Sequence, residues 1–200
     1  MHDDKTTRGA GRPRSAEKND AILRAAVDLL ARQGYVRMTL DQVAAAAGVS
    51  KSTIHLRWKT KAGLLTAALA AVRTADAPPP SGDVRADLVA ILRDFAATIA
   101  QVNGMALIGT CLAEEDHTPE LLALLRARSV LPRRALLREV LERAREEGGI
   151  RPDADLEAAV SALIGPFYAD YLAGRGDHPE WAEQAVDLTL TALRPEGNGK

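Results

Sequence analysis

Residues 39–65, TLDQVAAAAGVSKSTIHLRWKTKAGLL, predict a helix, a tight turn and a second short helix. Gln42 follows Thr39 by three residues, which is the capping-box spacing that satisfies two backbone amides at the start of the first helix. Gly48 can leave that helix in a left-handed conformation, and Ser50 is a preferred cap for the next one. The segment therefore predicts two helices joined by a short turn.

The second helix has a buried side and a polar side. Ile54 and Trp58 are four residues apart, so both are expected on the face that packs against the first helix. The outward side carries short hydrogen-bonding side chains and cations, namely Lys51, Ser52, Thr53, His55, Arg57 and Lys59. A small basic helix that a second helix holds at a fixed angle can enter the major groove of DNA.

The spacing of three residues supports a helix-turn-helix. Ala44 is small where the two helices cross, Gly48 permits the turn, and Ile54 fills the gap between the helices. An ordinary pair of antiparallel helices is the alternative. The flanking sequence favours the DNA-binding interpretation, because residues 20–34 have an amphipathic helical pattern and residues 60–72 resume a helix.

Residues 22–65 resemble the TetR family of bacterial transcriptional repressors. The family's usual pattern is held here by Gly34, Tyr35, Thr39, Val43, Ala44, Ala47, Gly48, Val49, Ser50, Lys51, Thr53, Ile54, Lys61 and Leu64. Two positions depart from it: His55 stands where Tyr is commoner, and Trp58 where Phe is commoner. The family's tyrosine usually contacts a phosphate, and a histidine can do the same with some dependence on pH near its usual pKa of about 6.5.

The pattern and the resemblance together predict an all-α fold of about nine helices. An N-terminal three-helix helix-turn-helix domain is joined to a C-terminal helical bundle. A low aromatic content of 4% and abundant Ala, Leu and Arg also favour helices over sheets. The expected divisions are a disordered basic arm (1–14), the DNA-binding domain (15–73), a linker (74–82), an effector-binding and dimerisation domain (83–194) and a mobile tail (195–200).

Helix signals also divide the C-terminal part. Three consecutive prolines in ADAPPPSGD, residues 75–83, cannot continue the preceding helix. Thr118 before Pro119 is a strong start signal, and Pro132 predicts a kink or break further along. The helices expected after the linker cover residues 84–102, 105–115, 119–148, 155–173 and 179–193.

Charge is distributed unevenly along the chain. Residues 1–61 contain 12 Lys and Arg against 6 Asp and Glu, whereas residues 62–200 contain 14 against 21. The overall net charge of −1 therefore conceals a basic head and an acidic body. Confinement of positive charge to the segment with the helix-turn-helix pattern supports binding to double-stranded DNA.

DNA contacts are expected from three groups of residues. Base edges are expected to meet Lys51, Ser52, Thr53 and Arg57, and phosphates to meet Thr39, His55, Lys59 and Lys61. Arg8, Arg12 and Arg14 of the arm either reach a phosphate or minor groove, or belong to a tail that only aids solubility. A phosphate contact is the alternative for Arg57, and a core position is the alternative to a phosphate contact for Tyr35.

Two helical segments of the C-terminal part, 156–172 and 181–193, have thin polar faces, so more than one side of each must be covered. They either fill the core of a monomer or also pack against a second copy, as TetR-like proteins do. The residues assigned to a homodimer interface are Leu163, Phe167, Trp181, Val186 and Leu190. A two-fold dimer would place two heads on a near-palindromic operator.

The resemblance implies a repressor that a small, largely apolar effector releases from DNA. The effector's identity is unknown, and the candidate cavity wall is Phe95, Met105, Ile108, Cys111, Leu112, His117, Leu121, Leu125, Phe167 and Tyr171. Ordinary core packing is the alternative for each of them. His117 lies beside three acidic residues, but consecutive positions on a helix end point in different directions, so no metal site is expected.

Other classes of protein fit the sequence less well. The four histidines are scattered and no Gly-rich phosphate loop follows a strand, so neither an enzyme nor a cofactor is expected. A helical protein-binding adaptor remains the other alternative. The single cysteine excludes an intrachain disulfide framework. No apolar segment approaches about 18 residues, so we expect a cytoplasmic protein without a membrane partner.

Overall fold

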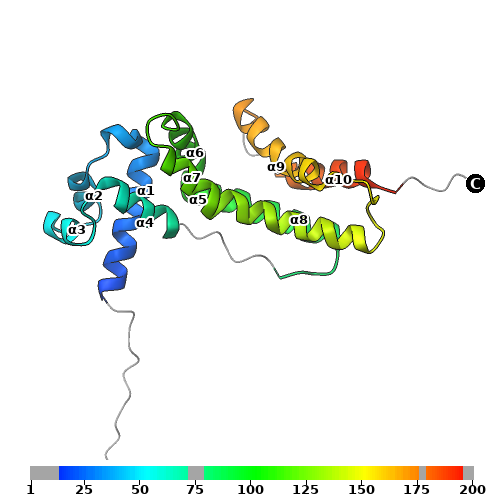
Figure 1. The fold of residues 1–200 in the computed structure, drawn as a ribbon, viewed down its shortest axis with the longest axis horizontal. Coiled ribbons are helices and arrows are strands. Elements are labelled where there is room, and N and C mark those ends of the chain that lie inside the picture. Colours follow the sequence, from blue (N-terminus) through cyan, green and yellow to red (C-terminus); the bar gives the residue numbers. More distant parts are fainter. Residues whose placement is uncertain (1–13, 72–78, 176–178, 196–200) are drawn as a thin grey trace, which may run out of the picture.

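The computed structural model describes residues 14–71, 79–175 and 179–195. Within these ranges the chain forms ten α-helices, one π-helical segment and no strand (Figure 1). The expected all-α class is confirmed. The bounds are α1 Arg14–Arg37, α2 Leu40–Ala46, α3 Lys51–Arg57, α4 Lys61–Ala71, α5 Val84–Gln101, α6 Gly104–Ala113, α7 Pro119–Leu125, η1 Arg126–Val130, α8 Leu131–Glu146, α9 Leu156–Leu172 and α10 Trp181–Leu193.

Several expected segments fall partly or wholly outside the described residues. They include Arg8 and Arg12 of the arm, residues 74–78 of the linker and residues 196–200 of the tail. Arg14, which was expected in the arm, is the first residue of α1. The helix begins six residues before the predicted start because Ala16, Glu17 and Lys18 are all good helix formers.

Helix α1 is interrupted where the sequence places a glycine. Gly34 has φ 76° and ψ 167°, a conformation that side chains with a Cβ rarely adopt. The chain then turns into α2, which begins after Thr39; α2 packs against α1, α3 packs against α2, and α4 packs against α1 (Figure 1).

The molecule has two hydrophobic cores, and they do not divide at the linker. The first core joins the head, α1–α4, to α6 and α7, with Leu107, Cys111 and Leu121 buried beside Leu30 and Leu64. The hydroxyl group of Thr110 on α6 also donates a hydrogen bond to the carbonyl oxygen of Leu30 on α1, at 3.4 Å. Helices α6 and α7 are therefore packed as part of the head, although they follow the linker in sequence.

The second core is formed by α5, α8, α9 and α10. Its fully buried residues include Leu88, Leu92, Leu137, Val160 and Leu163. Figure 1 shows the head at one end of an elongated molecule and α9 and α10 towards the other, with α5 and α8 running between them. Helix α5 thus contributes to the second core and leads directly into α6 of the first.

One helix was expected over residues 119–148, but the structure divides it into α7, η1 and α8. Pro132 lies in the first turn of α8, immediately after the π-helical segment. Proline has no backbone N–H to donate and its ring collides with the carbonyl group four residues earlier, so the turn before it widens. Thr118 precedes α7 as expected, but its side chain forms no capping hydrogen bond.

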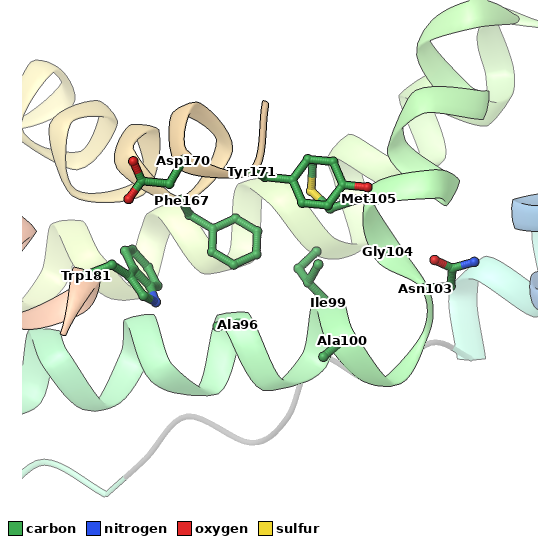
Figure 2. Close-up of a pocket in the computed structure, with 10 residues that line it drawn as sticks. All are labelled: Ala96, Ile99, Ala100, Asn103, Gly104, Met105, Phe167, Asp170, Tyr171 and Trp181. Carbon is green, nitrogen blue, oxygen red and sulfur yellow. The ribbon is translucent and has the colours of Figure 1, made fainter. Parts of the chain in front are cut away.

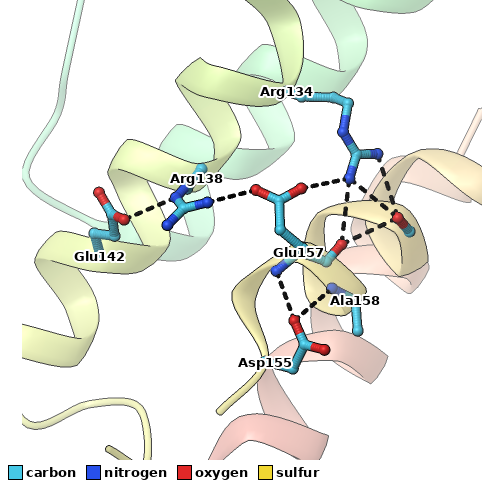
Figure 3. A network of polar contacts seen from close by, with 7 residues as sticks. Arg134, Arg138, Glu142, Asp155, Glu157 and Ala158 are labelled. Carbon is cyan, nitrogen blue, oxygen red and sulfur yellow. Dashed lines mark hydrogen bonds and ion pairs between the residues drawn. The ribbon is translucent and has the colours of Figure 1, made fainter. Parts of the chain in front are cut away.

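A polar network joins α8 to α9 on the surface of the second core (Figure 3). The two carboxylate oxygens of Glu157 accept hydrogen bonds from Arg134 at 2.7 Å and from Arg138 at 2.6 Å. These bonds lower the pKa of Glu157, and hydrogen bonds to Glu142 and to Glu157 raise the pKa of Arg138. Asp155 caps the start of α9 through the amides of Glu157 and Ala158.

Candidate DNA interface and ligand pocket

Helix α3 is presented to solvent by the capping pattern that the sequence predicts. The side chain of Thr39 accepts a hydrogen bond from the amide of Gln42 at 3.2 Å, and the amide of Thr39 donates to the Gln42 side chain at 2.8 Å. Gly48 has φ 65°, and the hydroxyl of Ser50 accepts from the amide of Thr53 at 3.2 Å. Ile54 is fully buried, so the opposite face of α3 points outward.

The outward face of α3 carries most of the expected DNA contacts. Lys51, Ser52, His55 and Arg57 are exposed, whereas Thr53 is half-buried. The hydroxyl of Ser50 lies 2.8 Å from the hydroxyls of both Ser52 and Thr53. The hydroxyl groups of Ser52 and Thr53 are therefore both engaged by Ser50 at the start of the helix.

An acidic residue of α2 lies among the cations of α3. The ammonium group of Lys51 is 2.5 Å from a carboxylate oxygen of Asp41, and Nε2 of His55 is 4.0 Å from the other oxygen. Arg57 donates a hydrogen bond at 3.3 Å to the side chain of Asn19 on α1. Lys51 and Arg57 are thus held by neighbouring helices, and Asp41 places a negative charge on the same surface.

Two lysines that were expected at phosphates have different surroundings. Lys59 is exposed and forms no hydrogen bond or ion pair with another described residue. The ammonium group of Lys61 donates hydrogen bonds to the carbonyl oxygens of Tyr35 at 2.5 Å and Met38 at 3.2 Å, and lies 4.1 Å from the centre of the Tyr35 ring. Lys61 therefore joins α4 to the end of α1, and its contact with a phosphate stays a prediction.

Leu56 is a candidate that the sequence reasoning missed. Its side chain is 85% exposed in the middle of α3, between His55 and Arg57. An apolar side chain at this position can pack against the C5-methyl group of a thymine in the major groove. The signal in the sequence was its position between His55 and Arg57, which are both on the outward side of the helix.

A pocket of about 430 Å³ lies between α5, α6, α9 and α10 (Figure 2). Helix α5 ends at Gln101, and the chain turns through Asn103, which has a left-handed φ of 50°, into α6. A side chain at Gly104 would approach the Ile99 side chain to 2.9 Å, so this close crossing of α5 and α6 requires glycine. The pocket is lined by Ala96, Ile99, Ala100, Asn103, Gly104, Met105, Phe167, Asp170, Tyr171 and Trp181.

A second pocket of about 150 Å³ lies on the other side of Ile99 and Gly104. Six of the ten residues expected in the cavity wall line one of the two pockets. They are Met105, Phe167 and Tyr171 in the larger pocket, and Phe95, Ile108 and Leu125 in the smaller one.

The other four expected residues line neither pocket and are corrected here. Cys111 and Leu121 are buried in the first core, where burial raises the pKa of the Cys111 thiol to about 11. Leu112 is 53% exposed and His117 is exposed. Cys111 lies on the side of α6 that packs into the first core and Leu112 on the side exposed to solvent, so neither faces the pockets.

Two of the residues assigned to a dimer interface cannot contact a partner. Leu163 and Val186 have no exposed surface, since they lie inside the second core of the subunit itself. Phe167 and Trp181 are half-buried, with ring centres 5.4 Å apart, and Leu190 is also half-buried. Because α9 is apolar on nearly all sides, its sequence did not distinguish the inward face from the outward one.

The described residues offer no metal site and no single membrane-spanning helix. No group of three or more His, Cys, Asp or Glu side chains converges among them. Only α5 and α6 taken together reach the length and apolar character of a span, and they are bent by 76° relative to each other.

Comparison with known proteins establishes the family. The profile for "Bacterial regulatory proteins, tetR family" matches residues 22–68, and that for "Tetracyclin repressor-like, C-terminal domain" matches residues 78–189. The chain is 32% identical over 189 residues to the uncharacterized HTH-type transcriptional regulator YdeS of Bacillus subtilis, with 92% of each chain covered. The chain belongs to the TetR family. The resemblance seen in residues 22–65 is thereby confirmed.

Two further comparisons place this TetR-family protein among regulators. It is 41% identical over 81 residues to the DNA-binding transcriptional repressor TetR of Mycobacteroides abscessus, covering 40% of this chain and 43% of that one. Its fold matches that of the TetR family transcription regulator SCO0332 with a TM-score of 0.60 and 31% identity, covering 90% of this chain and 100% of that one. The protein is therefore a DNA-binding transcriptional regulator and not an enzyme.

Proposed function

We propose that this TetR-family regulator is a repressor that binds a near-palindromic operator as a homodimer and is released by a small, largely apolar effector. The position of helix α6 between the pocket and the head is the main support for the proposal. Its first residues, Gly104 and Met105, line the larger pocket, whereas Leu107 and Cys111 are buried in the core of the head. A ligand that shifts the start of α6 would therefore shift the helix on which α1 rests.

The proposed DNA contacts lie on the outward face of the head. Lys51, His55, Leu56 and Arg57 of α3 would enter the major groove, and Lys59 would hold a phosphate. Ser52 and Thr53 would exchange their contacts with Ser50 for contacts with DNA. Thr39, at the start of α2, is exposed and would lie near the flanking phosphates.

The proposed dimer uses the outward faces of α9 and α10. On α9 the exposed residues are mostly small, Ala158, Ala162, Gly165 and Ala169, and on α10 Leu188 is 74% exposed. Small residues let two helices approach closely, and burial of Leu188 would contribute free energy of association. Such a dimer would set two α3 helices about 34–36 Å apart, the spacing of successive major grooves.

The test is a selection of DNA from a random duplex pool with the full chain. We expect an enriched near-palindrome whose two half-sites are about one helical turn apart, bound by two copies of the protein. A panel of aromatic amines, acids and alcohols is then screened for release of that duplex. The variant Ala96→Trp, which fills the larger pocket, serves as a control that binds the duplex but no longer responds. Enrichment of no sequence, or binding as a monomer, would contradict the proposal.

A further inference from the structure

Charge in the larger pocket has one sign. Among the ten described residues that line it, only Asp170 carries a formal charge, and the others are apolar, aromatic or neutral. Figure 2 shows Asp170 near Trp181 at one end of the pocket, and Asn103 and Gly104 at the other. A ligand held in this space therefore meets one carboxylate and no cationic side chain in the pocket wall.

The Asp170 carboxylate is only partly neutralised. Its side chain is 21% exposed, and Oδ1 lies 3.2 Å from the guanidinium group of Arg175, which is itself 60% exposed and does not line the pocket. Its other oxygen, Oδ2, forms no hydrogen bond or ion pair with a described residue. An exposed ion pair of this kind is weak, so a cation in the pocket can compete with Arg175 for the carboxylate.

Three aromatic residues line the same pocket as this carboxylate. Phe167, Tyr171 and Trp181 all line the pocket, and the rings of Phe167 and Trp181 are tilted by 58° at a centre-to-centre distance of 5.4 Å. The face of an aromatic ring attracts a cation, most strongly in the case of tryptophan. A pocket that combines a carboxylate with aromatic faces suits an ammonium group on an apolar body.

The two arginines of the smaller pocket do not offset the negative charge of Asp170, because each is paired with a carboxylate of its own. Arg133 lies 2.5 Å from Asp94, and Arg134 lies 2.7 Å from Glu157. At the far end of the larger pocket, the start of α6 offers backbone amides, which suit a neutral hydrogen-bond acceptor on the ligand. Asp170 therefore determines where the charged end of the ligand lies in the pocket.

We propose that the larger pocket takes an organic cation, with its ammonium group between Asp170 and Trp181 and its apolar body against Ile99 and Ala96. This inference rests on the proposed function, which gives the pocket its ligand, and adds the ligand's chemical class. The ammonium group displaces Arg175 from Asp170 when it binds.

Three probes of similar size test whether the pocket prefers a positively charged ligand. Benzyltrimethylammonium is the cation, neopentylbenzene has the same shape with carbon in place of the charged nitrogen, and 3-phenylpropionate is the anion. Binding to the full chain is followed by tryptophan fluorescence, since Trp181 lines the pocket. We expect the cation to bind about tenfold more tightly than its neutral counterpart, and the anion to bind more weakly than both.

Two variants are expected to change binding of the cation in opposite directions. A general loss of structure would weaken binding in both. Asp170→Asn should abolish the preference for the cation over neopentylbenzene, whereas Arg175→Ala should strengthen binding of the cation several-fold by removing its competitor. Asp153→Asn is the matched control, because it removes an equal charge from a side chain that is 73% exposed and lies outside the pocket. It should leave all three affinities unchanged.

The outcomes separate this inference from the proposed function. Equal or tighter binding of the neutral or anionic probe, or no binding of any probe, would overturn the cationic assignment while leaving repression by the dimer intact. A clear preference for the cation that leaves affinity for the selected DNA duplex unchanged would instead support the pocket's assignment and contradict its role as the effector site.

Discussion

The ammonium group of Lys61 lies 2.5 Å from the carbonyl oxygen of Tyr35 and 4.1 Å from the centre of the same residue's ring. One side chain at the start of α4 thus satisfies a carbonyl group where α1 ends and covers an aromatic face. Tyr35 is half-buried and packs against the first core, which favours its core role over a phosphate contact. This contact fixes the angle between α1 and α4, and α1 in turn supports the outward helix α3 through Asn19 and Arg57.

Lys61→Met is expected to destabilise the head, because the carbonyl groups of Tyr35 and Met38 lose their charged donor. The expected cost is about 1–3 kcal/mol of the free energy of unfolding, measured by urea denaturation. Lys59→Met is the matched control, since Lys59 is exposed and unpaired among the described residues. It should leave stability unchanged but lower affinity for DNA and reduce the salt dependence by about one phosphate contact. Equal stability of the two variants would show that Lys61 is not structural.

Asp41→Asn is expected to strengthen DNA binding. The substitution removes a negative charge that lies 2.5 Å from the ammonium group of Lys51 and would face the phosphates. We expect a gain of about three- to tenfold in affinity at low salt, shrinking as salt rises, while stability changes by less than about 1 kcal/mol because the pair is exposed. The measurement is a salt series of binding titrations. A loss of affinity would mean that Asp41 positions Lys51 for DNA instead of competing with it.

Leu56→Ala is expected to weaken operator binding without affecting folding, because the side chain is 85% exposed. If Leu56 packs on a thymine methyl group, replacing that thymine by uracil should cost the wild-type protein up to about 1 kcal/mol and cost the variant nothing. Each thymine of the selected duplex is replaced in turn and affinity is measured with both proteins. Equal sensitivity of the two proteins at every position would exclude the contact.

Local signals explain why the head could be predicted from its sequence. The capping box of Thr39 and Gln42 and the turn at Gly48 depend on residues within a few positions of one another, and both are confirmed. Lys61 could not be assigned in this way, because its carbonyl partners lie more than twenty residues earlier and share its surroundings only in the folded chain.

The C-terminal part was harder to predict, because its helices are apolar on several sides. The spacing of Leu163 and Val186 identifies them as apolar helix residues, but their burial depends on which face the other helices cover. The pocket likewise arises from the bend between α5 and α6, which brings Met105 near Phe167 and Tyr171. Cys111, two turns further along α6, faces α1 instead.

Stability at acidic pH is expected to depend on Asp87. Burial alone would raise the pKa of this carboxyl, but hydrogen bonds donated by the hydroxyl and amide of Ser81, together with Arg143, hold it below its usual value. A pKa that is lower in the folded state contributes stability above the unfolded pKa, about 3.9, and that stability is lost as pH falls through the folded pKa.

Asp87→Asn should therefore cost about 2 kcal/mol at pH 7 and progressively less below about pH 4. Urea denaturation of both proteins at pH 7, 5, 4 and 3 gives the comparison. Asp187→Asn is a useful control, because its pKa is also lowered, by a hydrogen bond from Arg85, but the pair is exposed. A constant difference between wild type and Asp87→Asn across this range would show that the ionised carboxylate is not the source of the effect.

Dimerisation is expected to depend on Leu188 and not on Val186, although both lie on α10. Leu188 is 74% exposed in the single subunit, whereas Val186 is fully buried, so only Leu188 has surface to give to a second copy. Leu188→Glu should yield a folded monomer, detected by sedimentation, and should weaken binding to a two-half-site operator at least tenfold, because the second head no longer binds in the same complex. Leu131→Glu, at a residue 57% exposed on α8, is the matched control and should remain dimeric. If Leu188→Glu still sediments as a dimer, the outward faces of α9 and α10 are not the interface, and the spacing of the two α3 helices must be set by another surface.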